Sequence, residues 1–263
     1  MADHQAPALN QQIVLVTGGA RGLGKAVTEA FLREGAKVVI NYLNSREAAE
    51  ALANEANERA ANSAIAIQGD VTDPAAVKNI FDTAKEFFSA PISTVVNNAL
   101  ASFSFDGDAR PKADEIDWSR FTGQFEGNVR GAVNTTQAAL AGFEELGSGR
   151  IINIGTNLFQ HPVVPYHDYT ASKAALLSLT RTFAHDLGPK NITVNMLSGG
   201  LLRTTDASAA TPEEVFDFIA SGTPLRSVTT PAEFADAILF FASPWSRSVT
   251  GQNLVVDGGL VMD

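Results

Sequence analysis

The chain has 263 residues, of which 29 are acidic and 19 are basic, so its formal net charge is −10. Hydrophobic residues make up 45% and charged residues 18%, a globular composition that excludes a chain disordered throughout. Because there is no cysteine, disulfide scaffolds, thiolate metal sites and cysteine nucleophiles are excluded. The acidic balance argues against nucleic acid as the main partner, since phosphate binding needs clustered lysine and arginine.

The N-terminal residues 1–10 contain an aspartate and no basic run followed by an apolar stretch, so we expect a flexible arm rather than a signal peptide. No apolar run approaches the roughly 18 residues that span a membrane. We therefore expect a cytoplasmic protein with no membrane partner. Residues 11–263 are expected to form a single domain, because no linker, repeat or change of composition divides them.

Short apolar runs rich in valine and isoleucine alternate with longer segments of helical pattern. Continuous runs of this length are typical of strands buried on both faces. The predicted strands are 13–16, 38–40, 64–67, 94–96, 151–154, 192–196 and 254–256. The predicted helices are 22–34, 45–60, 74–88, 114–143, 168–187 and 231–242. The alternation predicts an α/β fold, a doubly wound parallel sheet of about seven strands with helices on both faces.

Residues 198–230 form the longest weakly patterned region and are rich in glycine, serine, threonine and proline, with a short helical piece at about 212–220. Long segments of this kind in a compact fold often cover a site. We therefore expect 198–230 to form a lid.

A glycine-rich loop, 17–24, follows the first strand and opens the first helix. Glycine lets the backbone turn tightly and approach a ligand, and the N–H groups of the helix N-terminus suit a pyrophosphate. This context predicts a dinucleotide site, although the spacing differs from the common GxGxxG pattern. A plain turn is the alternative. The candidate residues are Gly18, Arg21, Gly22, Leu23 and Gly24.

The end of the second strand bears on the choice of cofactor. An acidic residue there normally binds the ribose 2′-hydroxyl of NAD, but no aspartate or glutamate occurs between Lys37 and Arg46. Asn41 and Ser45 offer polar groups instead, and Arg21 offers a guanidinium that suits a 2′-phosphate. NADP(H) is therefore the expected cofactor. The alternative is that the arginines at 21 and 46 are solvated surface residues.

Two further strand ends carry candidate cofactor contacts. Asp70 and Val71 follow the third strand, and Asn98 and Ala99 follow the fourth. The carboxyl ends of parallel strands are where ligands bind in such sheets. Asp70 is equally typical of a turn before a helix, and Asn98 of a residue that ties strands together.

Tyr169 and Lys173 stand four residues apart at the start of a predicted helix and so share one face of it. A phenol titrates at about 10, and a neighbouring cation is expected to lower that pKa. Tyr169 is then a candidate proton donor to a carbonyl that receives hydride. Thr156, thirteen positions upstream at the end of the fifth strand, is placed to bond the substrate oxygen. A chance Tyr–Lys pair and a threonine that ties a loop are the alternatives.

These motifs together resemble the short-chain dehydrogenase/reductase family, and in particular its 3-oxoacyl-acyl-carrier-protein reductases and related carbonyl reductases. The resemblance covers about residues 11–260. It rests on TGGARGLG at 17–24, GDV at 69–71, NNA at 97–99, GRIINIG at 149–155, YTASK at 169–173, ITVN at 192–195 and VTGQNLVVDGG at 249–259. It implies a Rossmann-type single domain.

The resemblance also implies a role for each matching residue. Tyr169 matches the acid/base tyrosine, and Lys173 matches the lysine that binds the nicotinamide ribose and lowers the pKa of that tyrosine. The residues that match other positions are Asn128, which would hold a relay water, Thr156 for the usual serine, Arg21 of NADP-preferring members, and Asn98 and Thr204 as cofactor contacts.

The sequence departs from the family pattern in four places. Thr156 replaces serine, and Leu100 replaces the usual glycine after NNA. Ser198-Gly199-Gly200 stands where Pro-Gly is usual, which predicts a looser entry to the lid. About three extra residues between Trp118 and Asn128 predict an added helical turn or bulge in 119–127.

The expected activity is NADPH-dependent reduction of a ketone, of the 3-oxoacyl thioester or 3-oxoacyl-acyl-carrier-protein reductase type. The stretch 143–150 carries one basic and two acidic residues, which argues against docking of an acidic carrier protein. The alternatives are an NAD-linked alcohol dehydrogenase and a non-catalytic dinucleotide-binding regulator. The expected substrate wall is Phe159, His161, Tyr166 and Gly199. The resemblance implies a homotetramer, with a dimer as the alternative, and no metal.

Overall fold

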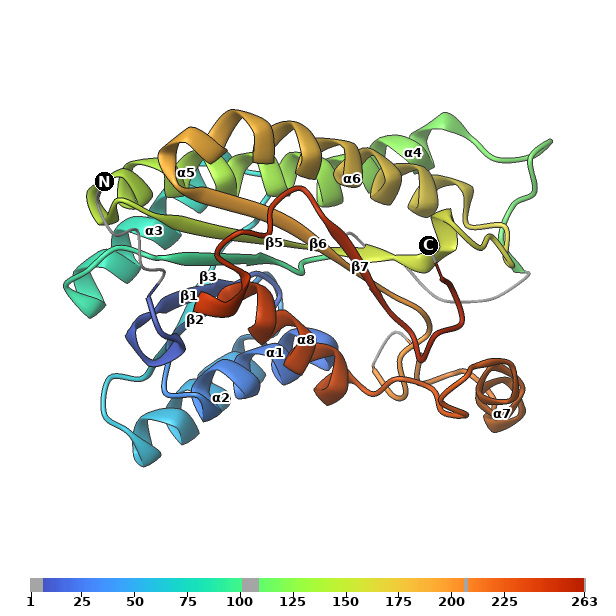
Figure 1. Ribbon diagram of the computed structural model, residues 1–263, viewed down its shortest axis with the longest axis horizontal. Coiled ribbons are helices and arrows are strands. Elements are labelled where there is room, and N and C mark those ends of the chain that lie inside the picture. The colour runs from blue at the N-terminus through green and yellow to red at the C-terminus, as the bar shows by residue number, and fades with distance from the viewer. Residues whose placement is uncertain (1–6, 101–108, 206–207, 263) are drawn as a thin grey trace.

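All seven strands pair in parallel and form one sheet in the order β3-β2-β1-β4-β5-β6-β7 (Figure 1). This computed structural model describes residues 7–100, 109–205 and 208–262. The strands are β1 (Ile13–Val16), β2 (Lys37–Tyr42), β3 (Ala64–Gln68), β4 (Thr94–Asn97), β5 (Gly149–Thr156), β6 (Ile192–Gly199) and β7 (Asn253–Val256). The predicted Rossmann-type sheet of about seven strands is confirmed.

Helices cover both faces of the sheet (Figure 1). One face carries α1 (Gly22–Arg33), α2 (Arg46–Arg59) and α8 (Pro231–Ala242). The other carries α3 (Pro74–Phe88), α4 (Trp118–Phe125), α5 (Gly131–Leu146) and α6 (His167–Leu187). The short helix α7 (Glu213–Gly222) stands apart from both layers, at the lower right of the view.

Strand β1 illustrates why the apolar runs are continuous rather than alternating. Val14 and Val16 pack into the core on the side of α1 and α8, together with Phe234. Ile13 and Leu15 point to the opposite face and pack into the core on the side of α3, α5 and α6. Because successive side chains point to opposite faces, a strand covered on both sides must be apolar at every position.

Local capping explains where several helices begin. The Asp73 side chain accepts a hydrogen bond from the Ala75 amide at 2.9 Å, ahead of α3. Thr230 and Glu233 bond reciprocally at the start of α8. Each helix also has proline in its first turn, where the missing N–H would have had no helical partner.

The helix predicted at 114–143 differs from the structure in two respects. It begins only at Trp118, because the Asp117 side chain caps the Ser119 amide there at 2.8 Å. It is also two helices, α4 and α5, joined by a π-helical turn, η3 (Glu126–Arg130). The irregularity expected in 119–127 therefore lies mostly after that range.

Other boundaries differ as well. Strands β5 and β6 continue beyond their predicted ends, to Thr156 and Gly199. Within the expected N-terminal arm, 1–10, the last two residues belong to a 3-10 helix, Leu9–Gln11, and residues 1–6 lie outside the described part of the chain. No helix within the described residues is long and apolar enough to cross a membrane.

The strand order places a crevice at the carboxyl ends of the central strands. The chain proceeds outward from β1 to β2 and β3, then returns to β4 on the other side of β1. In open α/β sheets the loops diverge at such a reversal and leave room for a ligand. A ligand site is therefore expected at the residues that follow β1 and β4.

Candidate active site

A cavity of about 1440 Å³ opens at the carboxyl ends of the strands. It is bounded by the loop after β1, the ends of β2 to β6, the first turns of α6, and α7. The sequence-predicted residues that line it are Gly18, Arg21, Gly22, Leu23, Gly24, Asn41, Ser45, Asp70, Val71, Asn98, Ala99, Thr156, His161, Tyr166, Tyr169, Lys173 and Gly199. Residues from both halves of the chain thus meet in one space.

The glycine loop adopts a conformation that side chains would block. Gly18 has φ of +62°, in the left-handed region. A Cβ on Gly24 would lie 2.1 Å from the Gly18 carbonyl oxygen. Gly22 begins α1, whose first amides have no helical partner. The tight loop and the helix N-terminus fit the pyrophosphate of a dinucleotide.

The polar residues around this loop are engaged in structural hydrogen bonds. The Asn98 side chain donates to the Thr17 carbonyl at 2.9 Å, and the Asn41 side chain donates to the Gly69 carbonyl at 3.0 Å. Asp70 accepts from both the amide and the hydroxyl of Thr72, as a turn aspartate does. Asn98 thus ties strands together and Asp70 forms a turn, as the alternatives for these two residues proposed. Both residues also line the cavity.

The two arginines considered for a 2′-phosphate have different surroundings. Arg46 donates to Glu50 at 3.2 Å and to Gln68 at 3.1 Å, and it is not part of the cavity lining. Arg21 precedes α1 in the N-cap position and lines the cavity. Of the two, Arg21 is the one placed to meet a cofactor.

The residues expected to carry chemistry lie together at the end of β5 and the start of α6. Tyr169 projects from the first turn of α6, and its hydroxyl shares a hydrogen bond with Thr156, the last residue of β5. Lys173, one turn further along α6, donates from Nζ to the Ile154 carbonyl at 2.8 Å. Its Nζ lies 5.9 Å from the centroid of the Tyr169 ring.

Burial governs the titration of both groups. Desolvation raises the pKa of Tyr169 to about 12, against a smaller opposing effect of the Thr156 hydrogen bond. Desolvation also lowers the pKa of Lys173 to about 7, since its ammonium is removed from water. The expected lowering of the tyrosine pKa is not found in this structure, because desolvation raises it by more than the Thr156 hydrogen bond lowers it. Tyr169 is therefore held in its protonated form, as a proton donor must be.

Asn128 lies behind the cavity wall rather than in its lining. It belongs to the π-helical turn η3, and its Nδ2 donates to the Ser172 hydroxyl at 3.0 Å and to Gln124 at 3.1 Å. Among the described residues, nothing bonds its buried Oδ1. Asn128 thus contacts the residue next to Lys173 and keeps one acceptor available for a water-sized ligand.

Two expected contacts lie elsewhere. Phe159, in the 3-10 helix Asn157–Phe159, packs against the apolar cluster around Leu176 and Met196 instead of lining the cavity. Thr204 is exposed and outside the lining, whereas its neighbour Thr205 belongs to it. Phe159 follows the end of β5 and Thr204 follows the end of β6. In such irregular segments, a shift of one residue turns a side chain toward the cavity or away from it.

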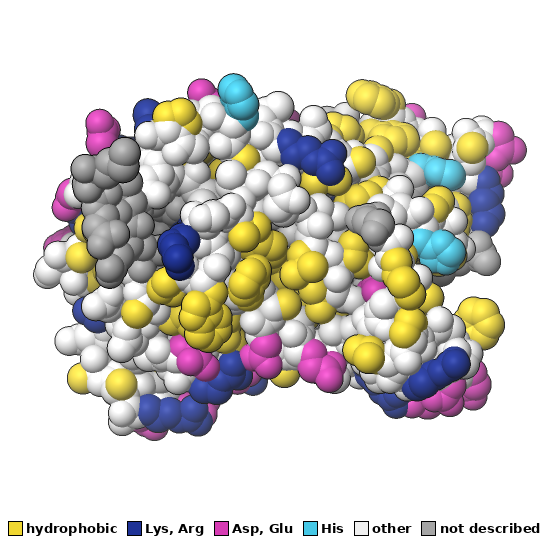
Figure 2. All heavy atoms as spheres, viewed as in Figure 1, with side chains coloured by type: hydrophobic (Ala, Val, Ile, Leu, Met, Phe, Trp, Pro, Cys, Tyr) yellow, Lys and Arg dark blue, Asp and Glu magenta, His cyan; other side chains and the backbone are white. Residues whose placement is uncertain are grey.

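Sequence reasoning missed much of the apolar wall. Val215, Phe218 and Ile219 of α7 line the cavity, and Phe218 is 78% exposed. Their spacing, i, i+3 and i+4, was the available signal that one face of the lid helix is apolar. Figure 2 shows hydrophobic side chains on the lobe at the lower right, where Figure 1 places α7. In the described part of the chain, no cluster of three or more histidine, aspartate or glutamate residues could hold a metal.

Comparisons with known proteins agree with this geometry. The family model described as enoyl-(acyl carrier protein) reductase matches residues 18–261. The chain is 35% identical to a versicolorin reductase of Emericella nidulans over 95% of this chain and 96% of that protein. It is 34% identical to a 3-oxoacyl-[acyl-carrier-protein] reductase of a Synechocystis strain, over 97% of this chain and 99% of that protein. It is also 33% identical to a (3R)-3-hydroxyacyl-CoA dehydrogenase of Canis lupus familiaris, over 97% of this chain and 98% of that protein. With the parallel sheet, the glycine loop and the Tyr169–Lys173 pair in place, these matches show that the chain belongs to the short-chain dehydrogenase/reductase family of oxidoreductases.

Proposed function

We propose that this oxidoreductase is an NADPH-dependent ketone reductase of the 3-oxoacyl reductase type. One observation carries the proposal: the hydroxyls of Tyr169 and Thr156 are hydrogen-bonded in the same cavity that the glycine loop lines. A carbonyl oxygen placed between the two hydroxyls would accept from both. The carbonyl carbon would then face the part of the cavity reserved for the cofactor.

The bound nicotinamide would supply hydride to the carbonyl carbon. Tyr169 would donate its proton to the oxygen, on which negative charge develops. Thr156 would hold that oxygen through its hydroxyl, and Lys173, with a pKa near 7, would return a proton to the phenolate at neutral pH. Asn128 would hold a relay water through Oδ1, its acceptor without a partner among the described residues. Each proton thus has a named donor on this chain.

The cofactor assignment to NADP(H) rests on Arg21 at the cavity and on Asn41 and Ser45 at the position where NAD enzymes carry a carboxylate. Replacing Arg21 with alanine is expected to raise KM for NADPH by about 10- to 100-fold, the value of a charge-assisted contact to phosphate. KM for NADH should stay unchanged, since NADH lacks the 2′-phosphate. Steady-state kinetics with both cofactors measure this.

The matched control for that change is Arg59→Ala, which removes an exposed arginine paired with Glu55 on the helix after β2. It should alter neither cofactor KM. Equal losses for NADPH and NADH in Arg21→Ala would show that the side chain stabilises the loop instead of selecting the phosphate.

The substrate would reach the site without an acidic carrier protein. The stretch before β5 presents the acidic residues Glu144 and Glu145, and the latter is paired with Lys85 at 2.6 Å. Arg150, the one basic residue of 143–150, is buried and donates to Thr193 at 2.8 Å. A surface of this charge repels an acidic partner. We propose a free ketone, a 3-oxo ester or a coenzyme A thioester as substrate.

The proposal is tested by following the absorbance of NADPH, and separately NADH, with simple ketones, acetoacetyl-coenzyme A and the same acyl group on a carrier protein. NADPH is expected to be consumed in preference to NADH, and the carrier-bound form should show no lower KM than the coenzyme A form. A preference for NADH would favour the NAD-linked alcohol dehydrogenase. Binding of NADPH without turnover of any ketone would favour a regulator.

We further propose that the chain acts as a single domain in the cytoplasm, with residues 198–230 as its lid, and assembles as a homotetramer. Large apolar side chains that are exposed on the surface of the single chain support this assembly. Trp118 of α4 is 72% exposed and stacks on Phe121, and Trp245 is 80% exposed. Large exposed aromatics of this kind are typical of subunit interfaces.

A further inference from the structure

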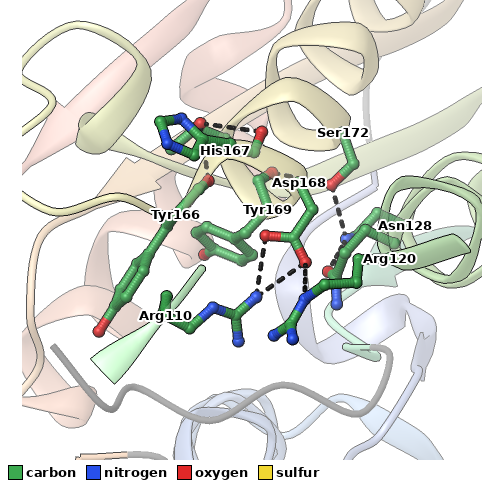
Figure 3. Close-up of polar contacts among 10 residues, drawn as sticks. Arg110, Arg120, Asn128, Tyr166, His167, Asp168, Tyr169 and Ser172 are labelled. Carbon is green, nitrogen blue, oxygen red and sulfur yellow. Dashed lines mark hydrogen bonds and ion pairs between the residues drawn. The ribbon is translucent and has the colours of Figure 1, made fainter. Parts of the chain in front are cut away.

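A buried ion pair lies beside the proposed proton donor and has no part in the mechanism above. Nη2 of Arg110 lies 2.8 Å from both carboxylate oxygens of Asp168. The two side chains are only 6% and 3% exposed. Nε of Arg120 approaches the same carboxylate at 3.8 Å, and Figure 3 shows both arginines directed at it. Two charges are removed from water only where the pair between them is well formed.

The pair contacts the catalytic turn of α6. Asp168 directly precedes Tyr169, and as an acidic residue in the first turn it also suits the positive end of the helix. The Arg110 guanidinium carbon lies 5.6 Å from the centroid of the Tyr166 ring, which lines the cavity. One guanidinium therefore contacts the residues at both 166 and 168, three and one positions before the proton donor (Figure 3).

The other end of the pair belongs to the connection between β4 and α4. Of this connection the structure describes 98–100 and 109–117, and in the latter the amides of Glu115 and Ile116 both donate to the Lys112 carbonyl, at 3.1 and 3.0 Å. Both of these hydrogen bonds are local to the segment. The bond from Arg110 to Asp168, across 58 residues of sequence, supplies a long-range attachment.

A second polar link lies one turn further along the same helix. Asn128 of η3 donates to Ser172 of α6 at 3.0 Å. Positions 168 and 172 lie on one face of α6. The segment from 109 to 130 is thus attached to that face at two successive turns, by charge at Asp168 and by an amide at Ser172. These two attachments define the position of α6 relative to the wall of the site.

We propose that Arg110 is a positioning residue for ketone reduction: by holding Asp168 and the Tyr166 ring, it fixes the substrate wall and the turn from which Tyr169 reaches the carbonyl. This role rests on the proposed function. The guanidinium of arginine matters, because its Nη2 reaches both carboxylate oxygens of Asp168 while its carbon lies over the Tyr166 ring. Lysine would keep the charge and lose that geometry.

Arg110→Met is expected to lower kcat/KM for the ketone by about 10- to 100-fold, the scale on which small misplacement of reacting groups acts. The Kd for NADPH should be unchanged, since the glycine loop joins β1 to α1, whereas Tyr166 and Asp168 lie at the start of α6. Arg110→Lys should recover part of the loss. Asp168→Asn, which keeps the shape and removes the charge, should show an intermediate loss. Arg33→Met, at an exposed pair with Asp236, is the matched control and should behave as wild type.

Hydrogen exchange provides a readout independent of turnover. In Arg110→Met, amides of 109–117 and of the first turn of α6 should exchange faster, while those of β1 and α1 should not. A folded Arg110→Met with wild-type kcat and KM overturns the proposal, even if its Tm is lower. If that variant does not fold, wild-type kinetics in both Arg110→Lys and Asp168→Asn overturn it.

The same set of measurements separates this proposal from the proposed function. Wild-type protein that binds NADPH and reduces no ketone would refute the reductase assignment. Faster exchange confined to the two attached segments in Arg110→Met would then still support the positioning role. Unchanged exchange would refute that as well.

Discussion

Replacing Tyr169 with phenylalanine is expected to lower kcat for ketone reduction by about 10²- to 10⁴-fold, the usual contribution of a positioned general acid. The phenol is buried and its pKa is raised to about 12, so it holds its proton until charge develops on the substrate oxygen. Phenylalanine keeps the ring and removes that proton. The Kd for NADPH, measured by fluorescence titration, should stay close to the wild-type value.

Tyr166→Phe is the matched comparison, since it removes a phenolic hydroxyl from the same cavity wall. The Tyr169 hydroxyl is hydrogen-bonded to Thr156, at the end of β5. We therefore expect a loss of less than about tenfold in Tyr166→Phe, as for a contact that does not transfer a proton. Comparable losses in the two variants would mean that the proton donor is assigned wrongly.

The fold was predictable because burial on both faces leaves a simple trace in the sequence. Each strand of the sheet must be apolar at consecutive positions, as Ile13 to Val16 are. Boundaries depend on contacts that such a pattern does not contain. The start of α4 is set by one side-chain bond of Asp117, and the π-helical turn at 126–130 has no periodic signature in the sequence.

The candidate site divides in the same way. Tyr169 and Lys173 are local to one helix, so their spacing alone places them on one face. The Arg110–Asp168 pair joins positions 58 apart, and only the folded chain brings them together. Titration behaviour was the least predictable property. Sequence spacing places Lys173 near Tyr169, whereas the pKa of Tyr169 is set mainly by desolvation, which depends on everything packed around it.

Lys173→Met is expected to inactivate the reductase and to remove the pH-dependent cost of burying Lys173. Burial lowers the pKa of Lys173 to about 7 in the folded state, against 10.5 for an exposed lysine. Between these values the unfolded chain binds a proton at this residue that the folded chain does not, so stability rises with pH across the window. The free energy of unfolding therefore decreases as the pH falls from 10.5 to 7. Below pH 7 both states bind the proton, and the cost of burying the charged lysine no longer changes with pH.

Methionine has no such proton, so the stability of Lys173→Met relative to wild type should be higher at pH 7 than at pH 10, by about 3–4 kcal/mol at about 1.4 kcal/mol per pKa unit. Urea unfolding of both proteins at the two pH values measures the difference, with Lys25→Met, at an exposed pair with Glu29, as the control. A gain independent of pH would show that Lys173 titrates as an ordinary lysine. A pH-dependent gain in an inactive variant would indicate that the lysine is retained for proton transfer at the expense of stability.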